Sequence, residues 1–93
     1  MTTSRPADPQ EAVLLVSCPD RRGIVAALAQ VLHGHGANIL DADQHTDPVA
    51  GQFFQRIRFD LSELLTDRVG LERGVSEVAA RFGMRFQLAY AGQ

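Results

Sequence analysis

Residues 12–40 read AVLLVSCPDRRGIVAALAQVLHGHGANIL, and this stretch decides the fold. The run from Ala12 to Cys18 is almost continuously apolar and stops at Pro19, which predicts a central strand covered on both faces. Asp20 is the predicted N-cap of a following helix. Apolar residues then recur at helical spacing and predict one buried stripe, formed by Ile24, Leu28, Val31 and Leu32.

The remainder of the chain alternates strand and helix patterns. The first helix should end at the Gly34-His35-Gly36 cluster. A strand over 38–46, a hairpin loop over 47–51 and a second strand over 52–61 are predicted to follow. The last predicted elements are a helix from a Thr66 or Asp67 cap to Gly83 and a strand over 84–90. In the third strand, alternation predicts an inward face of Phe53, Gln55, Ile57 and Phe59. The order βαββαβ predicts an α+β, ferredoxin-like two-layer sandwich, with a four-stranded antiparallel sheet and both helices on one face.

Length and charge limit the possible functions. Ninety-three residues allow a single domain, predicted over 11–91 after a disordered tail at 1–10. The net charge of -2 argues against a nucleic-acid partner or a membrane surface. The one cysteine, Cys18, cannot form an intramolecular disulfide, which favours a reducing, cytoplasmic location. The tail has no apolar run, so neither a signal peptide nor a membrane span is expected there.

The turn between the first strand and the first helix carries the candidate site. The N-terminus of that helix offers unpaired N–H groups and a partial positive charge, and Gly23 has no side chain to block a ligand. Asn38 adds an amide that both donates and accepts, which suits the ammonium and carboxylate of an amino acid. The pattern predicts a small zwitterion pocket. The same residues also fit structural roles, with Asp20 as a cap, Gly23 as a packing position and Asn38 closing the turn after Gly36.

Three motifs follow one another in this region: Cys18-Pro19-Asp20-x-x-Gly23-Ile24, Ala27-x-x-x-Val31-Leu32 and Gly36-x-Asn38-Ile39. Together they resemble the signature of ACT domains, which are regulatory modules with the same βαββαβ order. The resemblance implies self-association, side by side or face to face, with an amino-acid effector bound at the pairing surface. It places Cys18, Asp20, Gly23 and Asn38 at effector-binding positions, with Asp20 as the partner of the ligand's ammonium. Arg21 and Arg22 lie beside this pocket, where they either aid a carboxylate or are solvated.

A further stretch narrows the resemblance. Cys18-Pro19-Asp20 together with GQFFQR at 51–56 is similar to the N-terminal domain of the formyltetrahydrofolate deformylase family. Such enzymes hydrolyse 10-formyltetrahydrofolate to formate and tetrahydrofolate, which serves purine synthesis and one-carbon balance. The resemblance implies a regulatory part without catalytic residues or a cofactor of its own, a linker beginning at 92–93, and glycine or methionine as effectors. An ACT domain of another amino-acid regulator, of the glycine-cleavage type, is the alternative.

Other groups of residues in the sequence could also form sites. Asp41, Asp43 and His45 share one strand face and could ligate a metal, but strand spacing makes three ligands difficult, so a polar or inter-subunit face is the better interpretation. His33 and His35 cannot chelate together while helical. A nucleophilic Cys18 has no predicted histidine neighbour. An RNA-recognition-type domain has the same element order, but the first strand lacks the aromatic residues that stack bases.

Overall fold

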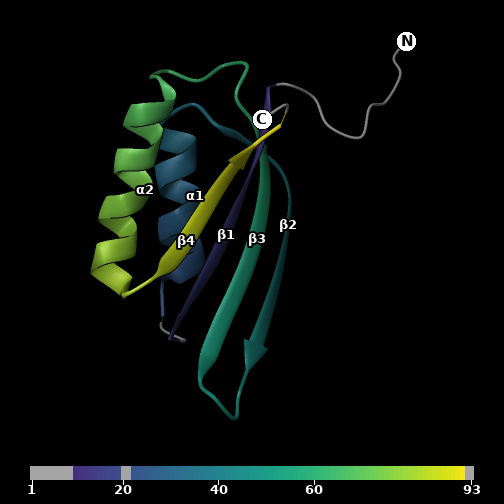
Figure 1. The fold of residues 1–93 in the computed structure, drawn as a ribbon, viewed down its shortest axis with the longest axis vertical. Helices are drawn as coiled ribbons and strands as arrows, with labels where there is room; N and C mark the ends of the chain where they lie inside the picture. Colours follow the sequence, from purple (N-terminus) through teal and green to yellow (C-terminus); the bar gives the residue numbers. More distant parts are fainter. Residues whose placement is uncertain (1–9, 20–21, 92–93) are drawn as a thin grey trace.

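The computed structural model describes residues 10–19 and 22–91, and the elements there follow the predicted order. They are β1 (Glu11–Pro19), α1 (Ile24–Gly34), β2 (Asn38–Asp47), β3 (Gln52–Asp60), α2 (Arg68–Phe82) and β4 (Arg85–Tyr90). The strands form one antiparallel sheet in the order β2-β3-β1-β4. Both helices cover the same face of the sheet (Figure 1). The ferredoxin-like fold class is therefore confirmed. The predicted tail apart from Gln10, the linker residues 92–93, and the site residues Asp20 and Arg21 lie outside the described residues.

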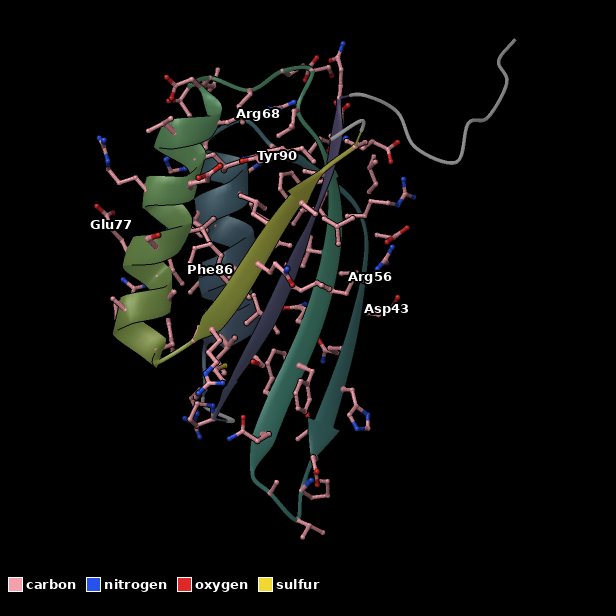
Figure 2. All side chains as sticks on the ribbon, in the orientation of Figure 1. Asp43, Arg56, Arg68, Glu77, Phe86 and Tyr90 are labelled. Carbon is pink, nitrogen blue, oxygen red and sulfur yellow. The ribbon has the colours of Figure 1, made fainter. Side chains whose placement is uncertain are left out.

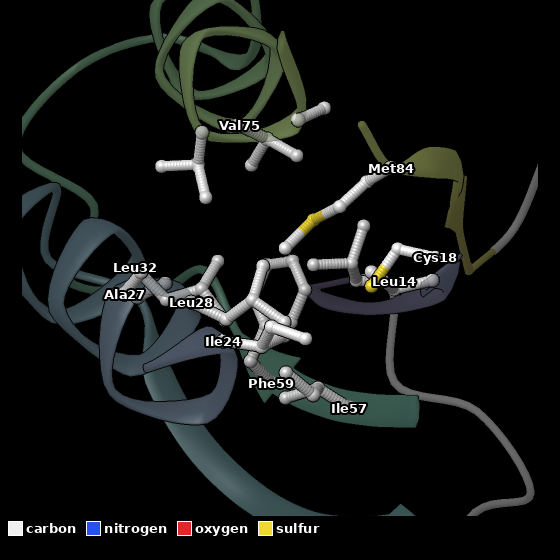
Figure 3. Close-up of a cluster of buried hydrophobic side chains, with 14 of the residues drawn as sticks. Leu14, Cys18, Ile24, Ala27, Leu28, Leu32, Ile57, Phe59, Val75 and Met84 are labelled. Carbon is white, nitrogen blue, oxygen red and sulfur yellow. The ribbon is translucent and has the colours of Figure 1, made fainter. Parts of the chain in front are cut away.

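The core lies between the helices and the sheet. The predicted alternation in β3 is confirmed, because all four inward side chains are buried, and the predicted stripes of both helices pack against them. Tyr90 of β4 donates a hydrogen bond to Glu72 of α2 at 2.6 Å, and the Arg68 guanidinium lies 4.2 Å from the centre of the Tyr90 ring. Figure 2 shows Arg68 and Tyr90 next to each other at one end of α2. Figure 3 shows the central buried side chains, among them Leu14, Leu28, Phe59 and Val75, each of which contributes about 1.5 to 3 kcal/mol by leaving water.

β1 is central, as predicted, but only one of its faces is covered. Its even-numbered side chains are buried, whereas Leu15 on the opposite face is 43% exposed. The prediction of a strand covered on both faces is therefore wrong for a single chain, because both helices lie on the same side. We call the uncovered side the outer face. It carries the side chains of Val13, Leu15, Ser17, Asp41, Asp43, His45, Phe54, Arg56, Arg58, Arg85, Gln87 and Ala89.

The two helices begin differently. Asp67 caps α2 as predicted, accepting a hydrogen bond from the Gly70 backbone N–H at 2.8 Å. α1 instead begins directly after Gly23, whose φ of +88° is in the left-handed region. The predicted Asp20 cap is therefore wrong, because Gly23 occupies the N-cap position. Among the described residues, neither helix is long and apolar enough to cross a membrane.

Candidate functional site

The β1–α1 turn keeps an open approach to the start of α1. Gly23 adopts a backbone conformation that other residues rarely take, and a Cβ added to it would meet no atom within 4 Å. Among the described residues, which leave out 20 and 21, no side chain caps the first N–H groups of α1, and the first turn of the helix contains no acidic residue. These N–H groups can therefore bind an anionic group such as a carboxylate.

The side chains predicted for this turn do not all face it. Cys18 is 2% exposed and its side chain lies in the core with Leu14 and Met84 (Figure 3), so only its backbone can face a ligand at the turn. This burial also gives no support to a nucleophilic role. Arg22 is exposed beside Gly23. Asp20 and Arg21 lie between the two described segments.

Asn38 lies at the opposite end of the sheet from the turn. It pairs with Asp60 of β3, and Asp60 pairs with Glu11, the first residue of β1. The turn follows Pro19 at the other end of β1, about 27 Å away at the rise of an antiparallel strand. The prediction that Asn38 and the turn form one pocket within a single chain is therefore wrong. The structure brings Cys18, Arg22 and Gly23 together and does not bring Asn38 to them.

Asn38 lines a different surface hollow, beside the C-terminal end of α1. The hollow has a volume of about 420 Å³, and its polar lining residues are His33, Asn38 and Glu63. Gly36 forms part of its wall, where the loop before α2 packs closely on the backbone. An imidazole, an amide and a carboxylate at one hollow can exchange hydrogen bonds with a small polar molecule.

The sequence pattern predicts only a core position for Gln55, and the environment of its side chain is unusual. The side chain is 5% exposed, and its Oε1 atom has no hydrogen-bond partner among the described residues. Gln55 pairs with Val16 of β1, three residues from the end of that strand, on the helix-covered face. A buried acceptor without a partner is rare and is a candidate contact for a ligand or water. The sequence does contain one sign of this environment, because Gln55 is the one amide among the inward residues of β3, beside Phe53, Ile57 and Phe59.

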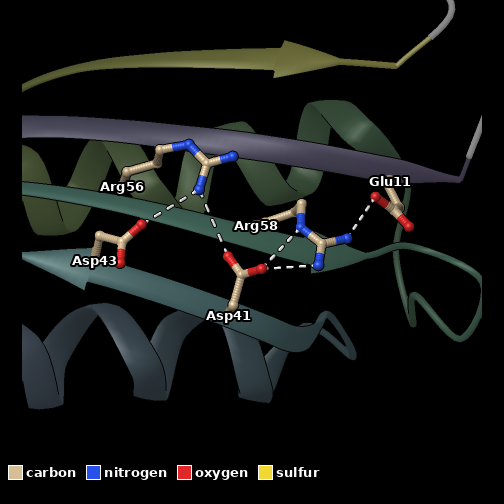
Figure 4. A network of polar contacts seen from close by, with 5 residues as sticks. All are labelled: Glu11, Asp41, Asp43, Arg56 and Arg58. Atoms are coloured by element: carbon tan, nitrogen blue, oxygen red, sulfur yellow. Dashed lines mark hydrogen bonds and ion pairs between the residues drawn. The ribbon is translucent and has the colours of Figure 1, made fainter. Parts of the chain in front are cut away.

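The outer face carries a set of ion pairs between β2, β3 and β1 (Figure 4). Arg58 donates hydrogen bonds to Asp41 at 3.1 and 2.7 Å and to Glu11 at 2.9 Å. The hydrogen bonds to Asp41 and then to Glu11 raise the pKa of Arg58. Nη1 of Arg56 lies 3.5 Å from Asp41 and 3.7 Å from Asp43. These carboxylates face arginines, in keeping with the polar face expected there.

His45 and His35 make contacts with other residues of the chain. His45 stacks on Phe54, with ring centres 6.2 Å apart. The Nδ1 atom of His35 is 2.7 Å from the Val31 carbonyl oxygen, to which it can donate a hydrogen bond. Within 10–19 and 22–91, no group of three or more His, Cys, Asp or Glu residues is placed to hold a metal ion.

An RNA-stacking surface does not fit the outer face either. RNA-recognition domains stack bases on aromatic residues of the central strands. Here β1 presents Val13, Leu15 and Ser17 on the outer face, and Phe54 is the aromatic residue that β3 adds. Arg58 is already neutralised by Asp41 and Glu11.

Comparison with known proteins agrees with the fold of the chain. The ACT domain family profile matches residues 12–82. The formyltetrahydrofolate deformylase of Bacillus subtilis is 43% identical over 81 residues, which are 86% of this chain and 27% of that protein. The deformylase of Synechocystis sp. is 39% identical over 82 residues, 88% of this chain and 29% of that protein. The chain thus spans between a quarter and a third of the length of these relatives.

Solved structures show the same likeness. A formyltetrahydrofolate deformylase from Pseudomonas syringae superposes with a TM-score of 0.83 at 31% identity, covering 89% of this chain and 28% of that chain. A putative glycine cleavage system transcriptional repressor superposes with a TM-score of 0.75 at 15% identity, covering 90% of this chain and 46% of that one. The second likeness concerns the fold alone.

Proposed function

The chain belongs to the ACT domain family, and from that premise we propose that it is the regulatory part of a formyltetrahydrofolate deformylase. Sequence identities of about 40% to proteins of that name support this parentage over the glycine-cleavage alternative, which rests on the fold alone. The whole enzyme would hydrolyse 10-formyltetrahydrofolate to formate and tetrahydrofolate in the cytoplasm. In this proposal the 93-residue chain senses an amino acid and assembles subunits, and performs no catalysis by itself.

The observation that carries the regulatory proposal is the open edge of β2. In the part of the chain that the structure describes, β2 pairs with β3 on one side and with no strand on the other, and all its residues from Asn38 to Thr46 are exposed. An edge of this length, about 31 Å at the rise of an antiparallel strand, leaves a row of backbone N–H and C=O groups that no described strand pairs. A second copy of the chain can cover it by antiparallel pairing of β2 with β2, which gives an eight-stranded sheet with two-fold symmetry.

This pairing also offers a way to complete the candidate site. A two-fold axis at the middle of β2 sets Asn38 of one copy level with Asp47 of the other. Asp47 is level with Gln52 and Pro19, and therefore lies at the end of the sheet that carries the β1–α1 turn. α1 contacts β2, so the turn leads from β1 towards the β2 side of the sheet. We propose that the effector binds between copies, its carboxylate at the start of one α1 and its polar groups near Asn38 of the other copy.

Regulation then follows from the shared interface. An effector that contacts both copies favours the arrangement in which its two sets of contacts lie close together. Catalytic parts attached to these domains would respond only by the difference in effector affinity between the two arrangements. Glycine and methionine are the effectors to test.

The test is isothermal titration calorimetry of glycine and L-methionine into the chain and into Asn38→Ala. We expect at least about tenfold weaker binding for Asn38→Ala, because one set of polar contacts to a charged ligand is lost. Gln87→Ala, an exposed amide on β4, is the matched control and should bind as the unsubstituted chain does. Equal affinity in Asn38→Ala would remove Asn38 from the site. Absence of any heat with either amino acid would leave subunit assembly as the regulatory role.

A further inference from the structure

Arg56 and Arg58 of β3 differ in the contacts that their guanidinium groups make with carboxylates. The Arg58 guanidinium makes three hydrogen bonds to Asp41 and Glu11, with a closest approach of 2.7 Å. The Arg56 guanidinium is about half exposed and makes no hydrogen bond to any residue that the structure describes. Its closest carboxylate oxygens are 3.5 and 3.7 Å away, beyond the 2.7 to 2.9 Å of a charged hydrogen bond. Figure 4 shows both contacts reaching the same terminal nitrogen, so the other donors of Arg56 are available.

Arg56 stands at the rim of an apolar hollow on the outer face. The hollow has a volume of about 240 Å³. Strand pairing places Leu15, Arg56 and Asp43 in one row across β1, β3 and β2, and places Phe54 and His45 in the next row. Leu15 and Phe54 are 43% and 42% exposed, and the His45 ring stacks on Phe54. The hollow therefore has apolar side chains at its base, with a cation and a largely exposed carboxylate, Asp43, at its edge.

We infer that this hollow is a ligand site for a hydrophobic α-amino acid. Arg56 binds the ligand's carboxylate through its available donors, and Asp43 accepts hydrogen bonds from the ammonium. The ligand's side chain covers Leu15 and Phe54, which leave water on binding. Arg56 and Asp43 are suitably spaced for this task, because the carboxylate and ammonium of an α-amino acid are themselves close neighbours. Figure 2 shows Arg56 and Asp43 next to each other on the β2 side of the sheet.

This site is separate from the effector site proposed above and does not rest on it. It lies within one chain, on the outer face, whereas the proposed effector site joins the start of α1 to Asn38 of a second copy. The apolar base also gives the two sites different preferences. Glycine has no side chain to cover Leu15 and Phe54, so this hollow should select against it, by about tenfold or more.

The experiment is a titration of the isotope-labelled chain with L-methionine, followed by backbone NMR. We expect saturable shifts at Leu15, Phe54 and Arg56. Glycine, which lacks the apolar side chain, and L-methionine methyl ester, which lacks the carboxylate, should each bind at least about tenfold more weakly. Arg56→Gln should weaken L-methionine binding by a similar factor. Arg85→Gln, which removes another outer-face cation, is the matched control and should not change it.

Three outcomes would overturn the inference. The first is equal affinity for L-methionine in the unsubstituted chain and Arg56→Gln. The second is a set of shifts confined to the β1–α1 turn and Asn38, which would assign binding to the proposed effector site alone. The third is a set of outer-face shifts that follow protein concentration and not ligand, which would assign this face to a second copy of the chain. Loss of the ligand-induced shifts at the β1–α1 turn in Asn38→Ala, with retention of the outer-face shifts, would separate the two proposals.

Discussion

Gly36 stands where the chain can accept no side chain. Its φ is +85°, and a Cβ added there would lie 2.5 Å from the Glu63 carbonyl oxygen and 2.8 Å from the Leu65 backbone nitrogen. Both neighbours are backbone atoms of the loop before α2, so neither can rotate away. Gly36→Ala should lower the free energy of unfolding by at least about 2 kcal/mol, the sum of left-handed strain and the clash.

Urea unfolding measures this loss, and Gly34→Ala is its control. A Cβ at Gly34, in the last turn of α1, meets nothing within 4 Å, and alanine should stabilise the helix there by up to about 1 kcal/mol. Similar unfolding free energies for the two variants would contradict the close packing of the loop on Gly36.

At Gln55 we expect the opposite effect, because a substitution there should raise the free energy of unfolding. Its buried Oε1 has no partner among the described residues, so folding removes this oxygen from water without compensation. Gln55→Leu should raise the free energy of unfolding by about 1 kcal/mol and the melting temperature by about 4 to 8 °C. Calorimetry of Gln87→Leu, an exposed glutamine, supplies the comparison, expected within about 0.5 kcal/mol of the unsubstituted chain. A loss of stability in Gln55→Leu would mean that the amide has a partner in solution.

Tyr90 links β4 to α2 through a hydrogen bond whose contribution to stability depends on pH. Burial and the hydrogen bond to Glu72 raise the pKa of Tyr90 above its ordinary value of 10.0. As the pH rises past about 10, the unfolded chain loses this proton while the folded chain keeps it, so the free energy of unfolding falls. Below that pH the contribution is fully present and constant.

Tyr90→Phe should remove this alkaline loss, and its unfolding free energy should stay flatter between about pH 9 and 11. The sequence has no lysine and a single tyrosine, so few other groups titrate there and phenolate absorbance reports Tyr90 directly. A phenolate midpoint near pH 10 in the folded chain would show that the hydrogen bond to Glu72 does not persist.

Local sequence patterns predicted the elements well and their mutual placement less well. Apolar periodicity located both helices and all four strands, because burial of one face acts residue by residue. The N-cap of α1 was misassigned because Asp20 has the preferred cap chemistry, whereas the left-handed Gly23 ends the turn three residues later. The position of Asn38 depends on topology: in a βαβ unit the second strand starts at the same end as the first, away from the turn between β1 and α1.

The candidate site could be predicted only in part, because its residues are brought together by the relative placement of strands and not by a local pattern. Gly23 was found because a glycine before a helix has a local backbone cause. Arg56 and Asp43 were not found as a pair, because the register between β2 and β3 brings them together across thirteen residues of sequence. The difference between the contacts of Arg56 and those of Arg58 depends further on Glu11 of β1, which forms an ion pair with Arg58 and not with Arg56. No spacing rule within one segment contains that information.

The exposed edge of β2 determines whether the chain is a monomer or a dimer. Ile39 and Leu40 are exposed there at 37% and 40%, beside a row of backbone groups that no other described strand pairs. Both features favour pairing with a second copy. Sedimentation velocity should therefore find a dimer at micromolar concentration, and Leu40→Lys should convert it to a monomer, because pairing would bring two added cations to one edge.

The control for this prediction uses an equally apolar residue away from the edge. Val49 at the tip of the β2–β3 hairpin is 97% exposed and makes no part of the β2 ladder, so Val49→Lys should remain a dimer. If both variants stay dimeric, the chain pairs through another surface, and the outer face with Leu15 and Phe54 becomes the surface to substitute. If the unsubstituted chain is already a monomer, Asn38 of one copy never reaches the turn of another, and the effector site proposed between copies must be abandoned. The dimer is thus the condition on which regulation through Asn38 depends, and its loss in Leu40→Lys should abolish any effector binding that Asn38→Ala weakens.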